Sequence, residues 1–158
     1  MAKLTKEEMK KKGIAQLQAM AARWTDQDGE FRQYVTRRID MLKMIGAGNT
    51  SGALALAVFL TTGTRTAAII SGAKIALLLF AIGMGAFVIA LRSLYLFESD
   101  FEAALLFLRG GKKPESTEVT TQITSAFDRS EQSGWLVVTS LWCFILASLI
   151  CFVGLLFS

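Results

Sequence analysis

The chain has 158 residues, of which 53% are apolar and 19% are charged, with a formal net charge of +4 at pH 7. The apolar residues gather in three long segments, and a chain this short has too little polar surface to cover them as a water-soluble domain would. Because the sequence has no histidine, it lacks the commonest general base and metal ligand, and we expect no enzyme activity, no metal and no cofactor.

Residues 1–43 are predicted to form two basic amphipathic helices. Thr5 and Glu8 have the spacing of a capping box, in which each side chain bonds the other residue's backbone N–H. The apolar residues that then recur with helical spacing are Ile14, Leu17, Met20, Ala21 and Trp24, followed by Phe31, Tyr34, Val35 and Leu42. The polar run at 25–29 predicts a break and a new N-cap between the two helices.

Three membrane-spanning helices are expected at 44–64, 73–92 and 135–157. A helix satisfies its own backbone hydrogen bonds, which lipid cannot do, and the last segment carries no charge over a length that crosses a hydrocarbon core. The first segment is the least apolar of the three. The outer loop at 65–72 is short, so the first two spans should be antiparallel neighbours.

The segment 93–134 is expected to begin as a helical continuation of the second span, which ends at Gly110 and Gly111. The polar stretch 115–124 reads as a turn or a mobile link. The net charge of residues 92–134 is −2, whereas that of residues 1–43 is +4. The basic N-terminal helices could lie on anionic headgroups, or pack against this segment or another copy of the chain, and the opposite charges favour packing.

The distribution of Lys and Arg predicts the orientation of the chain. Fifteen of the 17 basic residues would lie on the side of the N-terminus and the second loop, including the flank formed by Arg37, Arg38 and Lys43. Since basic residues concentrate on the cytoplasmic side, the N-terminus should be cytoplasmic and the C-terminus outside, in a bacterial inner membrane. The predicted fold is therefore all-α, with three transmembrane helices and cytoplasmic amphipathic helices.

Several residues of the spans are candidates for helix packing. Gly48 and Gly52 form a GxxxG spacing, and Gly83 and Gly85 lie in the second span, where small residues let helices approach closely. Ser140 and Ser148, eight residues apart in the third span, could bond across helices or to their own backbone. Cys143 and Cys151 are also eight residues apart in this span, and we interpret them as packing residues.

Arg65 and Lys74 are the two basic residues expected near the outer side. They could be interfacial anchors. In a ring of copies, they would place positive charge around the outer mouth of a pore and favour anions.

The run from Gly48 to Leu60 (GNTSGALALAVFL), followed by two more spans, resembles a broad set of small bacterial three-span membrane proteins of unassigned activity. The resemblance consists of a pattern of small and apolar residues, and it implies no functional residues.

Two functions from different classes follow from these features. In the first, the chain forms a homo-oligomer that perturbs or opens the membrane, as holins and antiphage membrane effectors do. In the second, it is a non-conducting anchor, scaffold or immunity-type inhibitor that binds a protein. The expected partners are membrane lipid, further copies of the chain and a cytoplasmic protein, but not nucleic acid.

Overall fold

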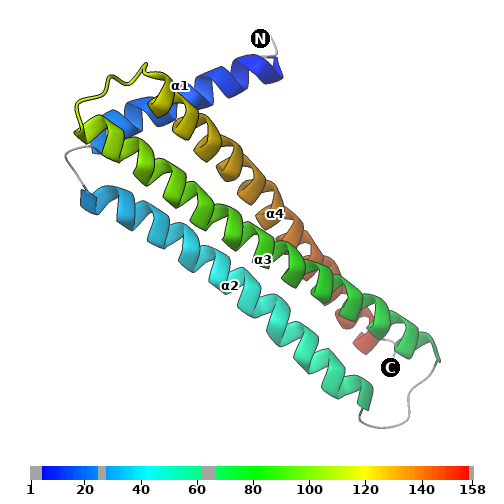
Figure 1. Cartoon of the computed structure of the whole chain (residues 1–158). Coiled ribbons are helices and arrows are strands. Elements are labelled where there is room, and N and C mark those ends of the chain that lie inside the picture. Colours follow the sequence, from blue (N-terminus) through cyan, green and yellow to red (C-terminus); the bar gives the residue numbers. More distant parts are fainter. Residues whose placement is uncertain (1–4, 25–27, 62–66, 157–158) are drawn as a thin grey trace. The chain divides into compact units, whose positions relative to one another are not determined.

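The computed structural model describes residues 5–24, 28–61 and 67–156, and in these residues the protein is all-helical (Figure 1). The helices are α1 (Lys6–Trp24), α2 (Asp28–Thr61), α3 (Ala67–Arg109) and α4 (Thr117–Leu156). Three of them, α2, α3 and α4, are long and apolar enough to cross a membrane, and α2 is the least apolar, as expected. This agrees with the three predicted spans and indicates a multi-pass membrane protein.

The chain forms two compact units. Unit 1 comprises Met1–Arg38 and Arg92–Gln132, and unit 2 comprises Ile39–Leu91 and Ser133–Ser158. Each of the three long helices contributes one part to each unit.

An aromatic cluster forms the centre of unit 1. The rings of Phe31 and Phe101 stack with their centroids 4.9 Å apart, and Phe97 and Trp24 lie 5.7 and 5.8 Å from Phe101. The phenylalanine side chains of the cluster are at most 2% exposed. Because Trp24 ends α1, Phe31 is in α2 and Phe101 is in α3, the cluster joins three helices by burying large apolar surfaces.

The N-terminal helices pack against the segment 92–132. Gly13 of α1 receives the ring of Phe127 from α4, and Lys10 pairs with Asp128 at 2.7 Å. The sequence left open whether the N-terminal helices lie on lipid headgroups or pack on another part of the protein, and in unit 1 they pack on the segment 92–132.

The capping box of α1 is also confirmed, since the Thr5 N–H donates to Glu8 Oε2 at 2.8 Å and lowers the pKa of that carboxyl.

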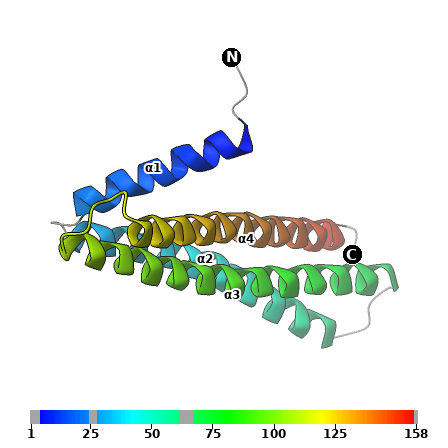
Figure 2. The ribbon, with the colours of Figure 1, turned by 45° about the horizontal axis from the view of Figure 1, so that its top comes forward.

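The helical extension of the second span is confirmed and ends where predicted. The N–H of Gly111 donates to the carbonyl of Leu108, and that of Lys112 donates to Phe107, so the helix closes with a Schellman motif. Gly111 has φ of 82°, which a residue with a side chain rarely adopts. Residues 110–116 then link α3 to α4 (Figure 2).

The expectation of a turn or mobile link across 115–124 is wrong from Thr117 onward, where α4 already begins. Val119, Ile123 and Ala126 recur at helical spacing and are fully buried in unit 1. Their burial stabilises a helix that the local run of threonines, with their low helix propensity, does not favour by itself.

A second correction concerns the outer loop, which was expected at 65–72. The helix α3 already begins at Ala67, because the apolar run from Ala67 to Ile70 continues the pattern of the span. Residues 65 and 66 lie outside the described residues.

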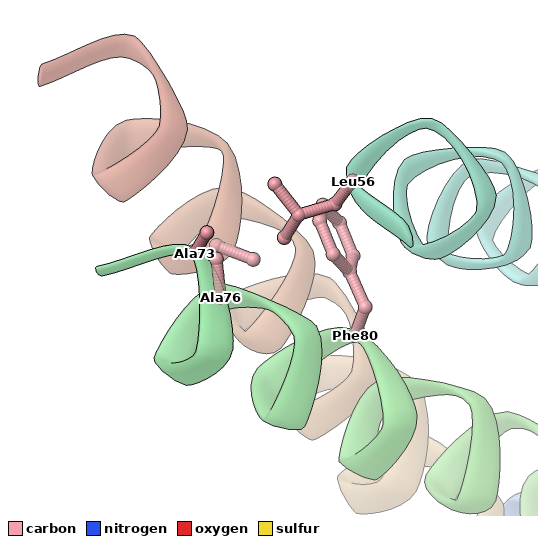
Figure 3. Close-up of a cluster of buried hydrophobic side chains, with 5 residues drawn as sticks. Leu56, Ala73, Ala76 and Phe80 are labelled. Atoms are coloured by element: carbon pink, nitrogen blue, oxygen red, sulfur yellow. The ribbon is translucent and has the colours of Figure 1, made fainter. Parts of the chain in front are cut away.

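In unit 2, α2 and α3 are antiparallel neighbours, as the short connection predicted. Gly46 faces Phe87, and Gly52, later in α2, faces Phe80, which comes earlier in α3. The two helices therefore run in opposite directions. Further along, Phe80 and Leu56 point toward each other across the two helices, beside Ala73 and Ala76 (Figure 3).

Candidate functional site

A buried amide connects the three membrane helices of unit 2. Asn49 of α2 is 0% exposed, and its Nδ2 donates to the Ser140 hydroxyl at 3.0 Å and the Ser140 carbonyl at 3.3 Å. The Ser140 hydroxyl in turn donates to the carbonyl oxygen of Gly83 at 2.8 Å. The chain of bonds thus runs from α2 through α4 to α3.

This connection suits an apolar surrounding, where a polar group without a partner is costly. The Ser140 hydroxyl both donates and accepts, so both of its roles are used inside the bundle. The Oδ1 of Asn49 has no hydrogen-bond partner and lies against Gly83, where a Cβ would come within 2.5 Å of it. Gly83 therefore leaves the space that the amide occupies.

Asn49 is the residue of this group that was not among the predicted site residues. The available signal was an amide inside a membrane helix, which needs partners from other helices. For Ser140, the structure selects the bond across helices from the two alternatives.

The predicted packing glycines take different places. Gly48 faces the ring of Phe144 in α4, with a Cβ position 3.2 Å from that ring, and Gly52 faces Phe80 in α3. The spacing of Gly48 and Gly52 thus serves contacts within the chain. Gly85 is exposed and has no atom within 4 Å of its Cβ position.

The outward faces of the three membrane helices differ in the size of their side chains. On α2, the small residues Ala47, Ser51 and Ala55 are exposed and follow one another at intervals of four residues, and the larger Met44, Leu54 and Val58 are also exposed on this helix. On α3, Ala81 and Gly85 form one exposed pair among large aliphatic residues. The exposed residues of α4 include Trp135, Val138, Trp142, Ile145, Leu149 and Phe152.

The predicted basic residues do not form one site. Lys74 is exposed, whereas Arg65 lies outside the described residues. In unit 1, Arg37 is exposed, and Arg38 donates to the Ser130 hydroxyl at 3.0 Å. In unit 2, Lys43 lies 3.7 Å from Asp40 on the same helix.

Arg38 also lies over two aromatic rings of unit 1. Its guanidinium carbon is 5.7 Å from the ring centre of Tyr34 and 5.9 Å from that of Phe97. These contacts are within the range of a cation–π attraction. This member of the predicted basic flank is thus engaged in packing within the chain.

The described residues contain no group of three or more Asp, Glu, Cys or His side chains placed to hold a metal. Both cysteines are free; Cys143 is buried and Cys151 is half-buried. Among family models, curated proteins and solved structures, no match to this chain is found.

Proposed function

We propose that the protein is a non-enzymatic integral membrane protein of the bacterial inner membrane whose copies associate and perturb or open the bilayer. The observation that carries the proposal is the exposed stripe of Ala47, Ser51 and Ala55 on α2. In lipid, association of helices depends on close packing, and small residues permit the closest approach of two backbones. The outward face of α4 is bulky by contrast and suits contact with lipid.

The hydroxyl groups of α2 support the second part of the proposal. Ser51 is in the stripe, and the neighbouring Thr50 is also exposed, with its hydroxyl bonded to the Gly46 carbonyl at 2.9 Å. A face with small and hydroxyl side chains is compatible with water when several α2 helices come together. The mean hydropathy of α2, which is the lowest of the three membrane helices, also supports contact of this helix with water.

The orientation in this proposal places unit 1 in the cytoplasm. Fifteen basic residues would lie on that side and two outside, which is the bias that sets the topology of multi-pass proteins. Unit 1 would then be the part of the chain that receives a cytoplasmic signal. Fusion of a reporter active only in the cytoplasm to each terminus tests this orientation, which requires activity at the N-terminus alone.

Cysteine cross-linking tests the association face. In a background with Cys143→Ser and Cys151→Ser, Ser51→Cys should form a disulfide-linked dimer in membranes upon mild oxidation. Thr139→Cys is the matched control, because Thr139 is an exposed hydroxyl residue of α4, next to the Ser140 that contacts Asn49. Equal cross-linking at the two positions would refute the proposed face.

Membrane opening is tested in cells and in vesicles. Expression of the wild-type chain should depolarise the inner membrane, measured with a voltage-sensitive dye, and the purified protein should release a small dye from liposomes. Ser51→Leu should abolish both effects by separating the helices, whereas Thr139→Leu should retain them. An intact potential under all inducing conditions, including phage infection, contradicts the proposal.

The alternative function, a non-conducting anchor, scaffold or immunity-type inhibitor, is favoured by another observation. The Asn49 Nδ2 and the Ser140 hydroxyl have their hydrogen-bond partners within one chain, and Gly48 and Gly52 face phenylalanine rings of the same chain. These contacts need no second copy. A monomer in mild detergent that co-purifies with a protein and leaves liposomes sealed would establish this alternative.

A further inference from the structure

Unit 2 contains an apolar cavity of about 820 Å³ that is lined by its three membrane helices and reaches their outward faces, because the exposed residues Ala55, Leu149 and Phe152 belong to its wall. The described residues that line it come from 52–59 of α2, 69–80 of α3 and 148–154 of α4. The cavity is partly open to its surroundings. Phe80 and Leu56 lie at its wall, where they close the space between α2 and α3 (Figure 3).

Small residues form part of the cavity wall. Gly72 and Gly154 line the cavity, and a Cβ on Gly154 would meet no atom within 4 Å. Ala55 and Ala73 contribute no more than a methyl group each to the wall. An open apolar concavity of this size on membrane helices has room for an apolar ligand from the bilayer.

The chemistry of the wall specifies an apolar ligand. Among the described lining residues, the polar side-chain groups are the hydroxyl of Ser148 and the thiol of Cys151, and none is charged. A cavity of about 150 Å³ with such a wall is enough to bind benzene. This one is more than five times larger, so it suits an extended hydrocarbon chain better than a single small ring.

A positive charge lies on the same helical turn of α3 as part of the wall. Lys74 directly follows Gly72 and Ala73 of the lining, and its side chain is exposed. Among the described residues 44–61, 67–91 and 133–156 it is the only charged side chain. Lys74 lies in the first part of α3, which begins at Ala67, and the long side chain of a lysine there extends its ammonium group along the helix toward the level of the lipid phosphates.

We propose that this cavity binds an acyl chain of an anionic phospholipid, with the lipid phosphate held by Lys74. The bilayer supplies the hydrocarbon at the partly open side of the cavity, and filling the space restores the van der Waals contacts that an empty wall lacks. Hydrocarbon alone gains little by leaving the bilayer, because lipid tails are as apolar as the wall. The charge of Lys74 therefore supplies the preference for an anionic headgroup.

The first experiment measures lipid retained by the intact chain. The protein is reconstituted in vesicles of equal amounts of phosphatidylglycerol and phosphatidylethanolamine, extracted in mild detergent and analysed by native mass spectrometry. We expect retained lipid, enriched in phosphatidylglycerol. Gly72→Leu with Gly154→Leu should abolish retention by filling the cavity, whereas Gly85→Leu, outside the cavity, should retain lipid as the wild type does.

Substitution of the lysine separates the two parts of the proposal. Lys74→Gln leaves the cavity open, so it should retain lipid but lose the preference for phosphatidylglycerol. An unchanged preference in this variant would overturn the headgroup assignment. Retention by the double glycine variant at the wild-type level would overturn the cavity assignment.

A second measurement avoids altering the wall, because Cys151 already lines the cavity and Cys143 does not. In Cys143→Ala, an apolar maleimide should label Cys151 in delipidated protein, and added phosphatidylglycerol should slow the labelling several-fold. Labelling at the same rate with and without the lipid contradicts occupancy of the cavity. Neither result depends on whether the protein opens the membrane, so this inference stands or fails separately from the proposed function.

Discussion

Gly83→Ala perturbs the contact between α2 and α3 at the buried amide. The new Cβ would lie 2.5 Å from Asn49 Oδ1 and 2.8 Å from its Cγ, so the amide must move. That movement weakens the bonds from Asn49 Nδ2 to Ser140. Forcing an extra carbon into a close-packed site costs about 1–3 kcal/mol, and an interhelical hydrogen bond in a membrane protein contributes about 0.6 kcal/mol.

Gly85→Ala is the matched control, because it makes the same change two residues away on the same helix. Its Cβ meets no atom within 4 Å. Replacing glycine by alanine in a helix is favourable by up to about 1 kcal/mol, and this gain is common to the two variants. We therefore expect Gly83→Ala to be less stable than Gly85→Ala by about 1–3 kcal/mol.

The assay is reversible unfolding in mixed micelles of a mild detergent and dodecyl sulfate, followed by circular dichroism. A double-mutant cycle strengthens it, because Asn49→Ala removes the atoms that the new Cβ meets. In that background Gly83→Ala should cost little, which gives a coupling of about 1 kcal/mol or more. Equal stability of Gly83→Ala and Gly85→Ala would refute the close approach of α2 and α3 at this position.

Three further predictions concern unit 1. Phe101→Ala should lower the free energy of unfolding of unit 1 by about 3–5 kcal/mol, since this fully buried ring joins three helices. A smaller loss in chemical unfolding would contradict that role. Burial, and then the nearby Glu102, raise the pKa of Glu98. The folded state therefore holds the Glu98 proton more tightly than the unfolded state, and the free energy of unfolding falls as the pH rises through and above the ordinary glutamate range. Glu98→Gln should accordingly raise Tm at neutral pH but not at a pH below that range. An equal gain in Tm at neutral and at low pH would contradict this prediction. Lys10→Ala should lower stability by less than about 1 kcal/mol, because Lys10 and Asp128 are both exposed, and the effect should shrink in high salt; a salt-independent loss would indicate another cause.

Local patterns in the sequence were sufficient for much of the fold. The three spans follow from segments long and apolar enough to cross a bilayer, and the capping box of Thr5 and Glu8 follows from a spacing that fits one helical turn. The end of α3 follows from Gly110 and Gly111, because a glycine easily takes the positive φ that terminates the helix. Such signals depend on residues within a few positions of one another.

The early start of α4 shows where local signals are not enough. Threonines between 117 and 124 favour other conformations, yet the segment is helical because Val119 and Ile123 are buried against the rest of unit 1. The charge difference between 1–43 and 92–134 did favour packing between them. It did not identify Phe127 against Gly13, or the stack of Phe31 and Phe101, which join residues distant along the chain.

The candidate sites depend still more on tertiary structure. Composition and periodicity establish that α2, α3 and α4 are membrane helices, because lipid imposes length and apolarity on each helix separately. Which face of each helix meets another depends on side chains that are far apart in the sequence. Only the folded chain brings Asn49 to Ser140 and Gly83, turns Gly48 and Gly52 inward, and leaves Ala47, Ser51 and Ala55 on the outside.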